Sequence, residues 1–502
     1  MKINIGDFLT RRSILTPNRE GLVCEDTRLT YKELNERANR LANAMTALGV
    51  GHGDRASILA FNEPEYYDMY FGLGKIGATL VPVNYRLAGP EIQYILSDCQ
   101  SKILVFGPEY TEVVDAIRND VPARDFIVIS DDPPKWASSY KAVTGDASDA
   151  EPQMVGGDDD TLTILYTSGT TGRPKGAELT HSYYYWNSVN LMCTLGLDIG
   201  DTNMIALPLF HIGALAGPPW VVHSGGKVVL LRTLDPQRFL ELIEEEKVTG
   251  FGSVPQLLDF LKLVPDFEKY DWSSIRTIMV YAAPVPVTLI KEYEAAGIEV
   301  RQLYGLTECN TGTVLDSENA IAKAGSCGRP FFHTEVRVVE DNGQDLAPGE
   351  KGEVLLRAPN MMKGYLNRPE ETVAAIKDGW LHTGDIGKLD EDGFLYILDR
   401  KKDMIISGGE NIYPAEIEDA LLNNPKVMDV GVIGYPHEKW GEAVKAIVVV
   451  KEGENLTEAE LIEWCQGKIG KFKIPKTVVI TDAIPRTPTG KILKTELRKQ
   501  FN

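Results

Sequence analysis

Residues 167–176 read Thr-Ser-Gly-Thr-Thr-Gly-Arg-Pro-Lys-Gly and follow the apolar run Leu-Thr-Ile-Leu-Tyr at 162–166. Glycines let backbone N–H groups approach an anion closely, and hydroxyl groups supply further hydrogen-bond donors. Arg173 and Lys175 add positive charge near the end of the segment. We therefore predict a strand that leads into a polyphosphate-binding loop, and we expect the rest of the chain to be organised around it.

Two other interpretations of this segment compete. A flexible surface turn would also be rich in Gly and Thr, but Pro174 and Lys175 stiffen and charge the end of the loop. The P-loop pattern G-x-x-x-x-G-K-[ST] does not fit, because Gly169 and Gly172 are too close together and Gly176 stands where a magnesium-binding hydroxyl is needed. The phosphate chemistry therefore differs from that of P-loop NTPases.

Composition limits the class of protein. A chain of 502 residues favours two or more domains. The formal net charge of −20 and the pI near 4.9 argue against general nucleic-acid binding and against electrostatic docking onto an anionic membrane. The six cysteines are scattered without disulfide-rich or zinc spacing, and no run approaches the ~20 apolar residues of a membrane span. We expect a soluble, cytoplasmic protein.

Up to about residue 325, helical patterns alternate with short apolar strands. Thr30 and Glu33 form a capping-box pattern at the start of the first such helix, whereas residues 131–157 are expected to be a connecting loop. The alternation predicts an α/β fold of wound sheets. From about 325 to 400, short strands and turns predict a small β-rich subdomain, and a small α+β unit follows.

Three further motifs carry groups suited to nucleotide chemistry. Residues 304–308, Tyr-Gly-Leu-Thr-Glu, combine a ring that can stack on a purine, a hydroxyl and a carboxylate that can hold magnesium. Asp385 is predicted in a glycine-bounded turn, where it could accept hydrogen bonds from a ribose, and Arg400 lies a short β-hairpin away. Lys491 ends a turn rich in Pro and Gly that would present it rigidly to a reaction centre.

In this order the motifs resemble those of the ATP-dependent acyl-adenylate-forming superfamily of acyl-CoA synthetases, luciferases and peptide-synthetase adenylation domains. The resemblance extends from Tyr31 to Lys494, and 384–418 is most similar to fatty-acyl-CoA synthetases of the mycobacterial very-long-chain type. It implies an N-terminal ATP- and acyl-binding domain at 1–400 and a mobile C-terminal domain at 401–502. Such enzymes join a carboxylate to AMP, release pyrophosphate, and transfer the acyl group to coenzyme A, so ATP, Mg²⁺ and coenzyme A are the implied ligands.

The resemblance assigns roles to individual residues of the adenylation site. The ATP phosphates would be held by Thr167, Ser168, Gly169, Thr170, Thr171, Gly172 and Lys175. The rest of the nucleotide would be bound by Ala282, Ala283, Pro284, Tyr304 and Gly305 around adenine and by Asp385 and Arg400 at the ribose. The catalytic set would be Thr307 at the α-phosphate, Glu308 on Mg²⁺, Lys491 between carboxylate and α-phosphate, and His211 beside the carboxylate.

The resemblance also implies a second conformation for the thioester step. Lys402 matches the hinge about which the small domain rotates, so that Lys491 leaves the site. Coenzyme A would be contacted by Gly408, Gly409, Trp440, Lys471, Lys473 and Lys476. Two half-reactions would therefore share one cleft.

The acyl pocket is predicted next to the motif at 208–211, Pro-Leu-Phe-His. Its walls would be His211, Ile212, Gly213, Ala214, Val254 and Gly312, and the small residues Gly213 and Ala214 would leave room for a chain. No aspartate stands near this motif to pair with a substrate ammonium, which disfavours amino acids. We predict a fatty acid–CoA ligase of medium to long chain preference.

Other functions stay open at this point. The same motifs serve aromatic-acid ligases of the coumarate or benzoate kind, and more remote alternatives are a luciferase-like oxygenase or a nucleotide-binding regulator without catalysis. The expected partners are a carboxylic acid, ATP and coenzyme A, without nucleic acid. We expect a monomer or homodimer, and at most peripheral contact with a membrane.

Overall fold

The computed structural model describes residues 2–167, 174–281, 285–407, 410–438, 440–466, 468–471, 473–486 and 490–501, with the backbone alone for Lys402, Glu410 and Asn411. The chain forms two compact units, which are described separately. Unit 1 comprises Met1–Glu335 and Leu356–Leu381, and unit 2 comprises Val336–Leu355 and His382–Asn502.

The first sheet of unit 1 carries the predicted phosphate-binding segment. Its eight strands lie in the order β19-β9-β8-β4-β3-β5-β6-β7. Their bounds are β3 Arg55–Leu59, β4 Thr79–Pro82, β5 Ile103–Phe106, β6 Asp125–Val128, β7 Ser138–Ser139, β8 Thr161–Thr167, β9 Lys175–Thr180 and β19 Gly364–Tyr365. Strands β3 to β8 pair in parallel, while β9 returns antiparallel to β8. The helices that connect these strands are α2 Tyr31–Ala47, α3 Glu65–Lys75, α4 Gly89–Asp98, α5 Thr111–Ile117 and α6 Tyr140–Gly145.

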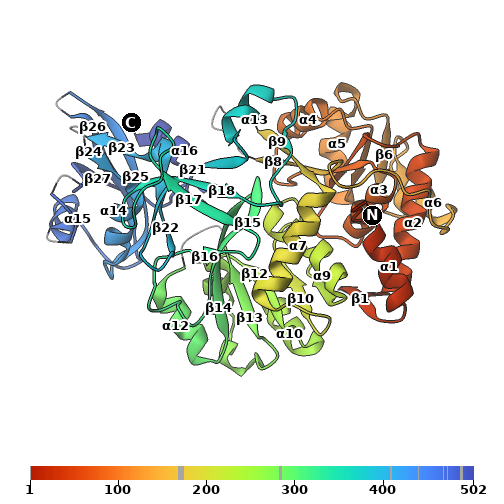
Figure 1. The fold of residues 1–502 in the computed structure, drawn as a ribbon, viewed down its shortest axis with the longest axis horizontal. Helices are drawn as coiled ribbons and strands as arrows, with labels where there is room; N and C mark the ends of the chain where they lie inside the picture. Colours follow the sequence, from red (N-terminus) through yellow and green to blue (C-terminus); the bar gives the residue numbers. More distant parts are fainter. Residues whose placement is uncertain are drawn as a thin grey trace. The chain divides into compact units, whose positions relative to one another are not determined.

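The second sheet of unit 1 has nine strands, in the order β16-β15-β14-β13-β12-β10-β11-β1-β2. They are β1 Glu20–Cys24, β2 Thr27–Thr30, β10 Thr202–Ile205, β11 Lys227–Leu230, β12 Gly250–Ser253, β13 Thr277–Val280, β14 Glu299–Leu306, β15 Cys309–Leu315 and β16 Arg329–Pro330. The helices of this half are α7 His181–Leu195, α8 Ile212–Leu215, α9 Gly217–Ser224, α10 Pro236–Glu246, α11 Pro255–Leu261 and α12 Val287–Ala295, several of which can be followed beside the sheet in Figure 1. The α/β fold of wound sheets is thereby confirmed.

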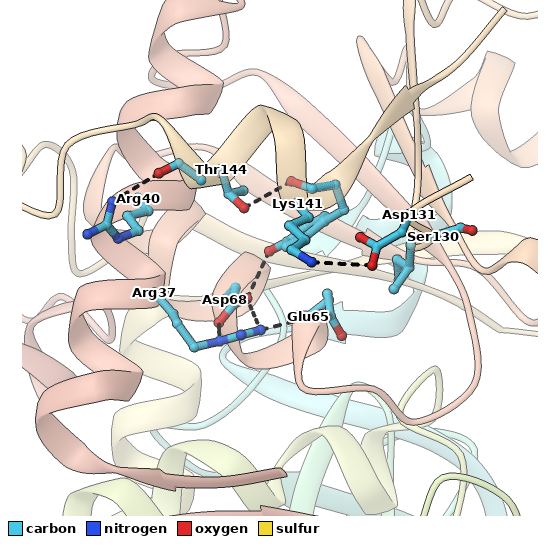
Figure 2. Close-up of a pocket in the computed structure, with 11 residues that line it drawn as sticks. Arg37, Arg40, Glu65, Asp68, Ser130, Asp131, Lys141 and Thr144 are labelled. Carbon is cyan, nitrogen blue, oxygen red and sulfur yellow. Dashed lines mark hydrogen bonds and ion pairs between the residues drawn. The ribbon is translucent and has the colours of Figure 1, made fainter. Parts of the chain in front are cut away.

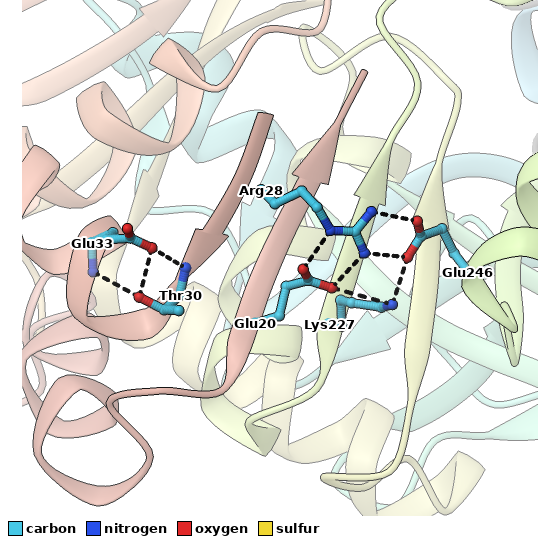
Figure 3. A network of polar contacts seen from close by, with 6 residues as sticks. All are labelled: Glu20, Arg28, Thr30, Glu33, Lys227 and Glu246. Atoms are coloured by element: carbon cyan, nitrogen blue, oxygen red, sulfur yellow. Dashed lines mark hydrogen bonds and ion pairs between the residues drawn. The ribbon is translucent and has the colours of Figure 1, made fainter. Parts of the chain in front are cut away.

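The start of helix α2 has the structure that the sequence predicted. The Thr30 side chain accepts a hydrogen bond from the Glu33 backbone N–H, and the Glu33 carboxylate accepts one from the Thr30 backbone N–H at 2.8 Å (Figure 3). These two bonds satisfy donors that the first helical turn leaves unpaired. The apolar face of α2, which includes Leu34 and Leu41, is completely buried.

A network of charges next to this cap ties one edge of the nine-stranded sheet together. Arg28 on β2 binds Glu20 on β1 and Glu246 at the end of α10, at 2.7 and 2.8 Å (Figure 3). Lys227 on β11 also binds Glu246, at 2.7 Å. The hydrogen bonds from Arg28 lower the pKa of Glu246 to about 2. Strands β1 and β2 are therefore linked at this edge to β11 and α10, which lie about 200 residues later in the chain.

The expectation of a plain connecting loop at 131–157 is wrong in part. This stretch contains strand β7 and helix α6. Tyr140 at the start of α6 is buried and donates a hydrogen bond to Asp68 of α3 at 2.9 Å. Because the stretch is rich in Asp, Pro and Ser, its composition does not reveal this buried side chain.

Unit 2 contains most of a five-stranded sheet and all of a second one. The first has the order β17-β18-β21-β20 with β22 beside β21, where β17 is Glu335–Val339, β18 Gly352–Arg357, β20 Ile376–Lys377, β21 Trp380–Leu389 and β22 Leu395–Arg400. The second has the order β24-β23-β26-β25 with β27 beside β26. Its elements are β23 Ile405–Ser407, β24 Glu410–Ile412, α14 Pro414–Leu422, β25 Val427–His437, β26 Gly441–Val450, α15 Glu458–Cys465, β27 Thr477–Ile480 and α16 Lys494–Phe501.

The two units divide within strands β18 and β21 and not at residue 400. The reason is that β22 pairs with the part of β21 that follows Leu381 and so stays with unit 2. The mobile boundary after residue 400 remains a prediction. Among the described residues, no helix combines the length and the apolar character needed to cross a membrane.

Candidate active site

The predicted phosphate-binding segment is flanked by two antiparallel strands, β8 and β9. The strand predicted at 162–166 is β8, and its last residue Thr167 pairs in register with Lys175, the first residue of β9. The loop that joins them carries the predicted phosphate ligands Ser168, Gly169, Thr170, Thr171 and Gly172, and it lies outside the described residues. The two flanking residues of the predicted site are thus held side by side.

Lys175 is the cation of this hairpin, and two side chains from a later segment surround it. Its ammonium forms an ion pair with Glu371 of α13 (Pro369–Ala375) and lies 5.3 Å from the centre of the Tyr365 ring on β19. The side chain of Lys175 is 16% exposed. An anionic ligand that binds Lys175 therefore has to compete with the carboxylate of Glu371.

The predicted magnesium ligand lies against the same tyrosine. Thr307 and Glu308 form the tight turn between β14 and β15, in which Leu306 pairs with Cys309. The Tyr365 hydroxyl donates a hydrogen bond to Oε1 of Glu308 at 2.7 Å. Tyr183 of α7 donates to the backbone carbonyl of Thr307 at 2.9 Å. Tyr365 therefore contacts both the predicted phosphate-binding cation and the predicted metal-binding carboxylate.

The chemistry of Glu308 fits a magnesium ion bound together with a nucleotide. Mg²⁺ takes oxygen ligands, keeps several waters, and commonly binds through one or two carboxylates plus substrate phosphates. The described residues contain no group of three or more His, Cys, Asp or Glu that could hold a metal without a substrate. A single carboxylate close to the hairpin predicted to bind phosphate is the donor set expected for a metal that binds together with a nucleotide.

Glycine is required beside this turn. Tyr304 and Gly305 lie on β14, and a Cβ at Gly305 would lie 1.9 Å from the carbonyl oxygen of Asn310 on the returning strand. A Cβ at Gly312 would lie 2.7 Å from the carbonyl oxygen of Tyr304. Close pairing of β14 with β15 thus accounts for both glycines. The other predicted adenine contacts, Ala282, Ala283 and Pro284, lie outside the described residues.

The predicted ribose pair lies within unit 2, and the two residues are in contact. Asp385 and Arg400 are opposite each other on β21 and β22, and Arg400 Nε lies 2.7 Å from Asp385 Oδ1. Asp385 is nearly buried, at 4% exposure, while the Arg400 side chain is 43% exposed. The hairpin relation is confirmed, but the turn predicted around Asp385 is wrong. Gly384 has a φ of 68°, yet it lies within strand β21, which runs from Trp380 to Leu389.

Lys491 lies at the end of a closed turn in unit 2. Arg486 and Ile492 form a β-bridge, and the Leu493 backbone N–H donates to the Pro485 carbonyl at 2.8 Å. Arg486 also binds Asp429 on β25 at 2.6 Å, which anchors the turn to the sheet. Lys491 itself is exposed. Residues 487–489 lie outside the described residues, so the rigid presentation of this lysine stays a prediction.

The residues predicted for the hinge and for coenzyme A are only partly described. Lys402 is in a short 3₁₀ turn, its side chain is not described, and Gly408 and Gly409 lie outside the described residues. Trp440 is 40% exposed, and Lys471 and Lys476 are exposed on the surface of unit 2. Lys473 forms an ion pair with Glu416 of α14, so a phosphate would have to displace that carboxylate.

His211 immediately precedes helix α8, in the loop after β10. Its ring lies 4.5 Å from that of Phe210, measured between centroids. The buried Asn62 holds this loop, since it accepts a hydrogen bond from the Leu209 N–H at 2.9 Å and donates one to the Leu207 carbonyl at 3.1 Å. The position of His211 therefore depends on a residue far away in the sequence.

The expected room beside Gly213 is filled by protein. The Tyr281 hydroxyl donates to the Gly213 carbonyl at 2.8 Å, and a Cβ at Gly213 would lie 2.5 Å from the Tyr281 ring. The expectation that Gly213 leaves space for an acyl chain is thus wrong in this structure. Of the other predicted walls, Ala214 is buried, Ile212 is half-buried, and Val254 packs partly buried against the core under β12.

Sequence reasoning missed three residues that organise this region: Tyr365, Tyr281 and Asn62. Each acts through a contact with a segment that lies 57 or more residues away. A lone tyrosine or asparagine in an apolar segment carries no local pattern that would single it out. Their importance becomes visible only in the folded chain.

A separate cavity of about 510 Å³ lies in unit 1 and shares no residue with the predicted site. Its wall contains the Arg37–Asp68 ion pair, at 2.6 Å, with Glu65 beside it (Figure 2). Burial, followed by repulsion from Asp68, raises the pKa of Glu65 to about 7. Arg37 already satisfies the buried carboxylates, so we interpret this cluster as a structural tie between α2, α3 and α6.

Comparison with known proteins identifies the family to which the chain is similar. The model of the AMP-binding enzyme family matches residues 9–366, and that of the AMP-binding enzyme C-terminal domain matches residues 416–491. The chain is 43% identical to the long-chain-fatty-acid–CoA ligase FadD13 of Mycobacterium tuberculosis strain H37Rv and 40% identical to a feruloyl-CoA synthase of Amycolatopsis sp.. Each alignment covers 99% of both chains.

Among solved structures, the o-succinylbenzoate coenzyme A synthetase MenE of Bacillus subtilis in complex with ATP and magnesium ion has a TM-score of 0.87 and 34% identity, over 98% of this chain and 99% of that one. The chain therefore belongs to the AMP-binding enzyme family, and the superfamily resemblance drawn from its motifs is confirmed.

Proposed function

We propose that this protein is an ATP-dependent fatty acid–CoA ligase that acts on medium to long chains. The observation that carries the proposal is the contact of Tyr365 with both Lys175 and Glu308, because the cation predicted to bind phosphate and the carboxylate predicted to bind Mg²⁺ then adjoin one side chain. Identity of 43% to a long-chain-fatty-acid–CoA ligase supports the choice of acid.

In the first half-reaction, an acid carboxylate attacks the α-phosphate of ATP and pyrophosphate leaves. Two anions meet, so cations and hydrogen-bond donors have to offset the charge on the five-coordinate phosphorus. In this proposal Lys175 and residues 168–172 would bind the phosphates that leave, and Glu308 would hold Mg²⁺, which would offset phosphate charge. Thr307 would contact the α-phosphate. Asp385 and Arg400 hold the ribose, and Lys491 binds the carboxylate and the α-phosphate together.

In the second half-reaction, the thiolate of coenzyme A attacks the acyl carbon of the adenylate and AMP leaves. Rotation of the C-terminal domain about Lys402 removes Lys491 and admits the thiol. The exposed Trp440, Lys471 and Lys476 are suited to the nucleotide end of coenzyme A, since an aromatic ring and two cations offer stacking and phosphate contacts. Domain rotation explains how one site serves both reactions.

An aromatic-acid CoA ligase is the second candidate. The observation in its favour is the 40% identity to a feruloyl-CoA synthase over the whole chain. The motifs around ATP do not distinguish the two, because they contact the part of the reaction that all such acids share.

A panel of carboxylic acids, assayed by pyrophosphate release and then by acyl-CoA formation, tests the proposal. We expect the highest kcat/KM for fatty acids of medium to long chain, with activity dependent on Mg²⁺. Faster turnover of ferulate, coumarate or benzoate would favour the second candidate. ATP binding without an adenylate from any acid would reject both.

A further inference from the structure

The ring of Tyr281 is clamped between two glycines from different elements. Tyr281 follows β13, and its backbone N–H donates to the Ser253 carbonyl at the end of β12 at 3.1 Å. A Cβ built at Gly213 of α8 would lie 2.5 Å from Cε2 of the ring, and one built at Gly252 of β12 would lie 2.3 Å from its hydroxyl oxygen. Real Cβ atoms essentially never approach another atom so closely. The absence of a side chain at both glycines therefore leaves the space that this ring occupies.

The phenol is also held in place by its hydroxyl, which donates to the Gly213 carbonyl at 2.8 Å. Burial raises the pKa of Tyr281, so the phenol stays protonated and remains a donor at neutral pH. The contact joins the first turn of α8, which begins directly after His211, to the ends of β12 and β13. The Tyr281 ring is contacted on both edges and hydrogen-bonded through its hydroxyl, so its position between α8 and β12 is fixed.

This arrangement has a consequence for the acid. The family resemblance implies that His211 lies beside the carboxylate. An acyl chain that extends from there along α8 would meet the Tyr281 ring at Gly213. We propose that Tyr281 closes the acyl pocket between α8 and β12 and thereby limits the length of the chain, so that acids of medium length are preferred to longer ones. This inference rests on the proposed fatty acid–CoA ligase activity.

The test is the dependence of kcat/KM on chain length, measured with the full-length protein, ATP, Mg²⁺, coenzyme A and saturated acids from hexanoate to palmitate. We expect the unchanged protein to turn over octanoate faster than palmitate. Tyr281→Ala removes the ring, and each additional buried methylene is worth roughly fourfold in affinity. We therefore expect the palmitate-to-octanoate ratio of kcat/KM to rise at least about tenfold.

Tyr281→Phe is the matched control, since it keeps the ring and removes the hydroxyl. Its ratio should stay within about twofold of that of the unchanged protein. Tyr281→Leu provides a smaller opening in case the alanine variant does not fold, and it should shift the ratio in the same direction. Thermal unfolding of each variant separates loss of fold from change of specificity.

The outcomes distinguish this inference from the proposed function. An unchanged ratio in Tyr281→Ala and Tyr281→Leu, with octanoate still a substrate, overturns the length limit and leaves the ligase activity intact. A preference of the unchanged protein for palmitate also overturns it. Absence of adenylate from every fatty acid overturns the proposed function first, and the length limit with it.

Discussion

Replacement of Tyr365 by Phe tests how Glu308 is held for magnesium. The Tyr365 hydroxyl donates to Glu308 Oε1 at 2.7 Å, a distance within the usual range for a hydrogen bond from a hydroxyl to a carboxylate, and this bond orients the carboxylate. The substitution removes this bond and keeps the ring against which Lys175 lies. We expect the carboxylate to rotate more freely and to bind Mg²⁺ in its productive orientation less often.

The size of the effect follows from the nature of the bond. Hydrogen bonds to charged groups contribute about 1.5–3 kcal/mol, and both partners here are only partly buried, so the lower value of about 1.5 kcal/mol applies. That value corresponds to roughly a tenfold change in an equilibrium constant. We expect the Mg²⁺ concentration that gives half-maximal adenylation to rise about tenfold.

The assay is pyrophosphate release with saturating acid and ATP while Mg²⁺ is varied. Tyr140→Phe is the matched control, because it removes a hydroxyl that donates to the carboxylate of Asp68 at 2.9 Å, in the separate cavity. It should lower thermal stability and leave the Mg²⁺ dependence unchanged. An unchanged or lower Mg²⁺ requirement in Tyr365→Phe would refute the positioning role.

Four other predictions address the remaining parts of the site and the fold. Lys491→Ala should reduce the rate of adenylation by about 100-fold or more, because it removes a group that stabilises charge in the transition state. Thioester formation from preformed acyl-AMP should be affected less. Equal losses in both half-reactions would argue against domain rotation. Lys402→Pro should mainly slow the thioester step, because proline restricts the backbone of the predicted hinge. Single-turnover assays of each half-reaction would test this, and an equal loss in adenylation would contradict it. Glu371→Gln should strengthen ATP binding severalfold at low salt, since Lys175 loses a competing carboxylate; isothermal titration would detect it, and weaker binding would contradict this reasoning. Glu246→Gln should lower stability at pH 7 by about 1 kcal/mol, a value discounted for solvent screening. Because the folded-state pKa of Glu246 lies at about 2, below its ordinary value of 4.5, the difference should persist above pH 4.5 and shrink as the pH falls towards 2; a difference that stays constant from pH 7 to 2 in thermal melts would show that charge is not its source.

Several local features of the fold and of the candidate site could be predicted from short sequence patterns. The capping box at Thr30 depends on residues three positions apart, and the strand before the phosphate loop depends on a short apolar run, so both could be predicted. Asp385 and Arg400 could be paired from sequence because a hairpin of known period brings them opposite each other. Family motifs added the roles of these residues, since several motifs in a fixed order are far more specific than any one of them.

Tertiary structure decided what surrounds those residues. The contacts of Tyr365 with Glu308 and of Tyr281 with Gly213 join segments 57 and 68 residues apart. Periodicity and capping report only on neighbours within one element, whereas these contacts depend on which strands become adjacent in the sheets. For the same reason, the small size of Gly213 suggested open space from sequence, although in the folded chain a tyrosine ring lies against it.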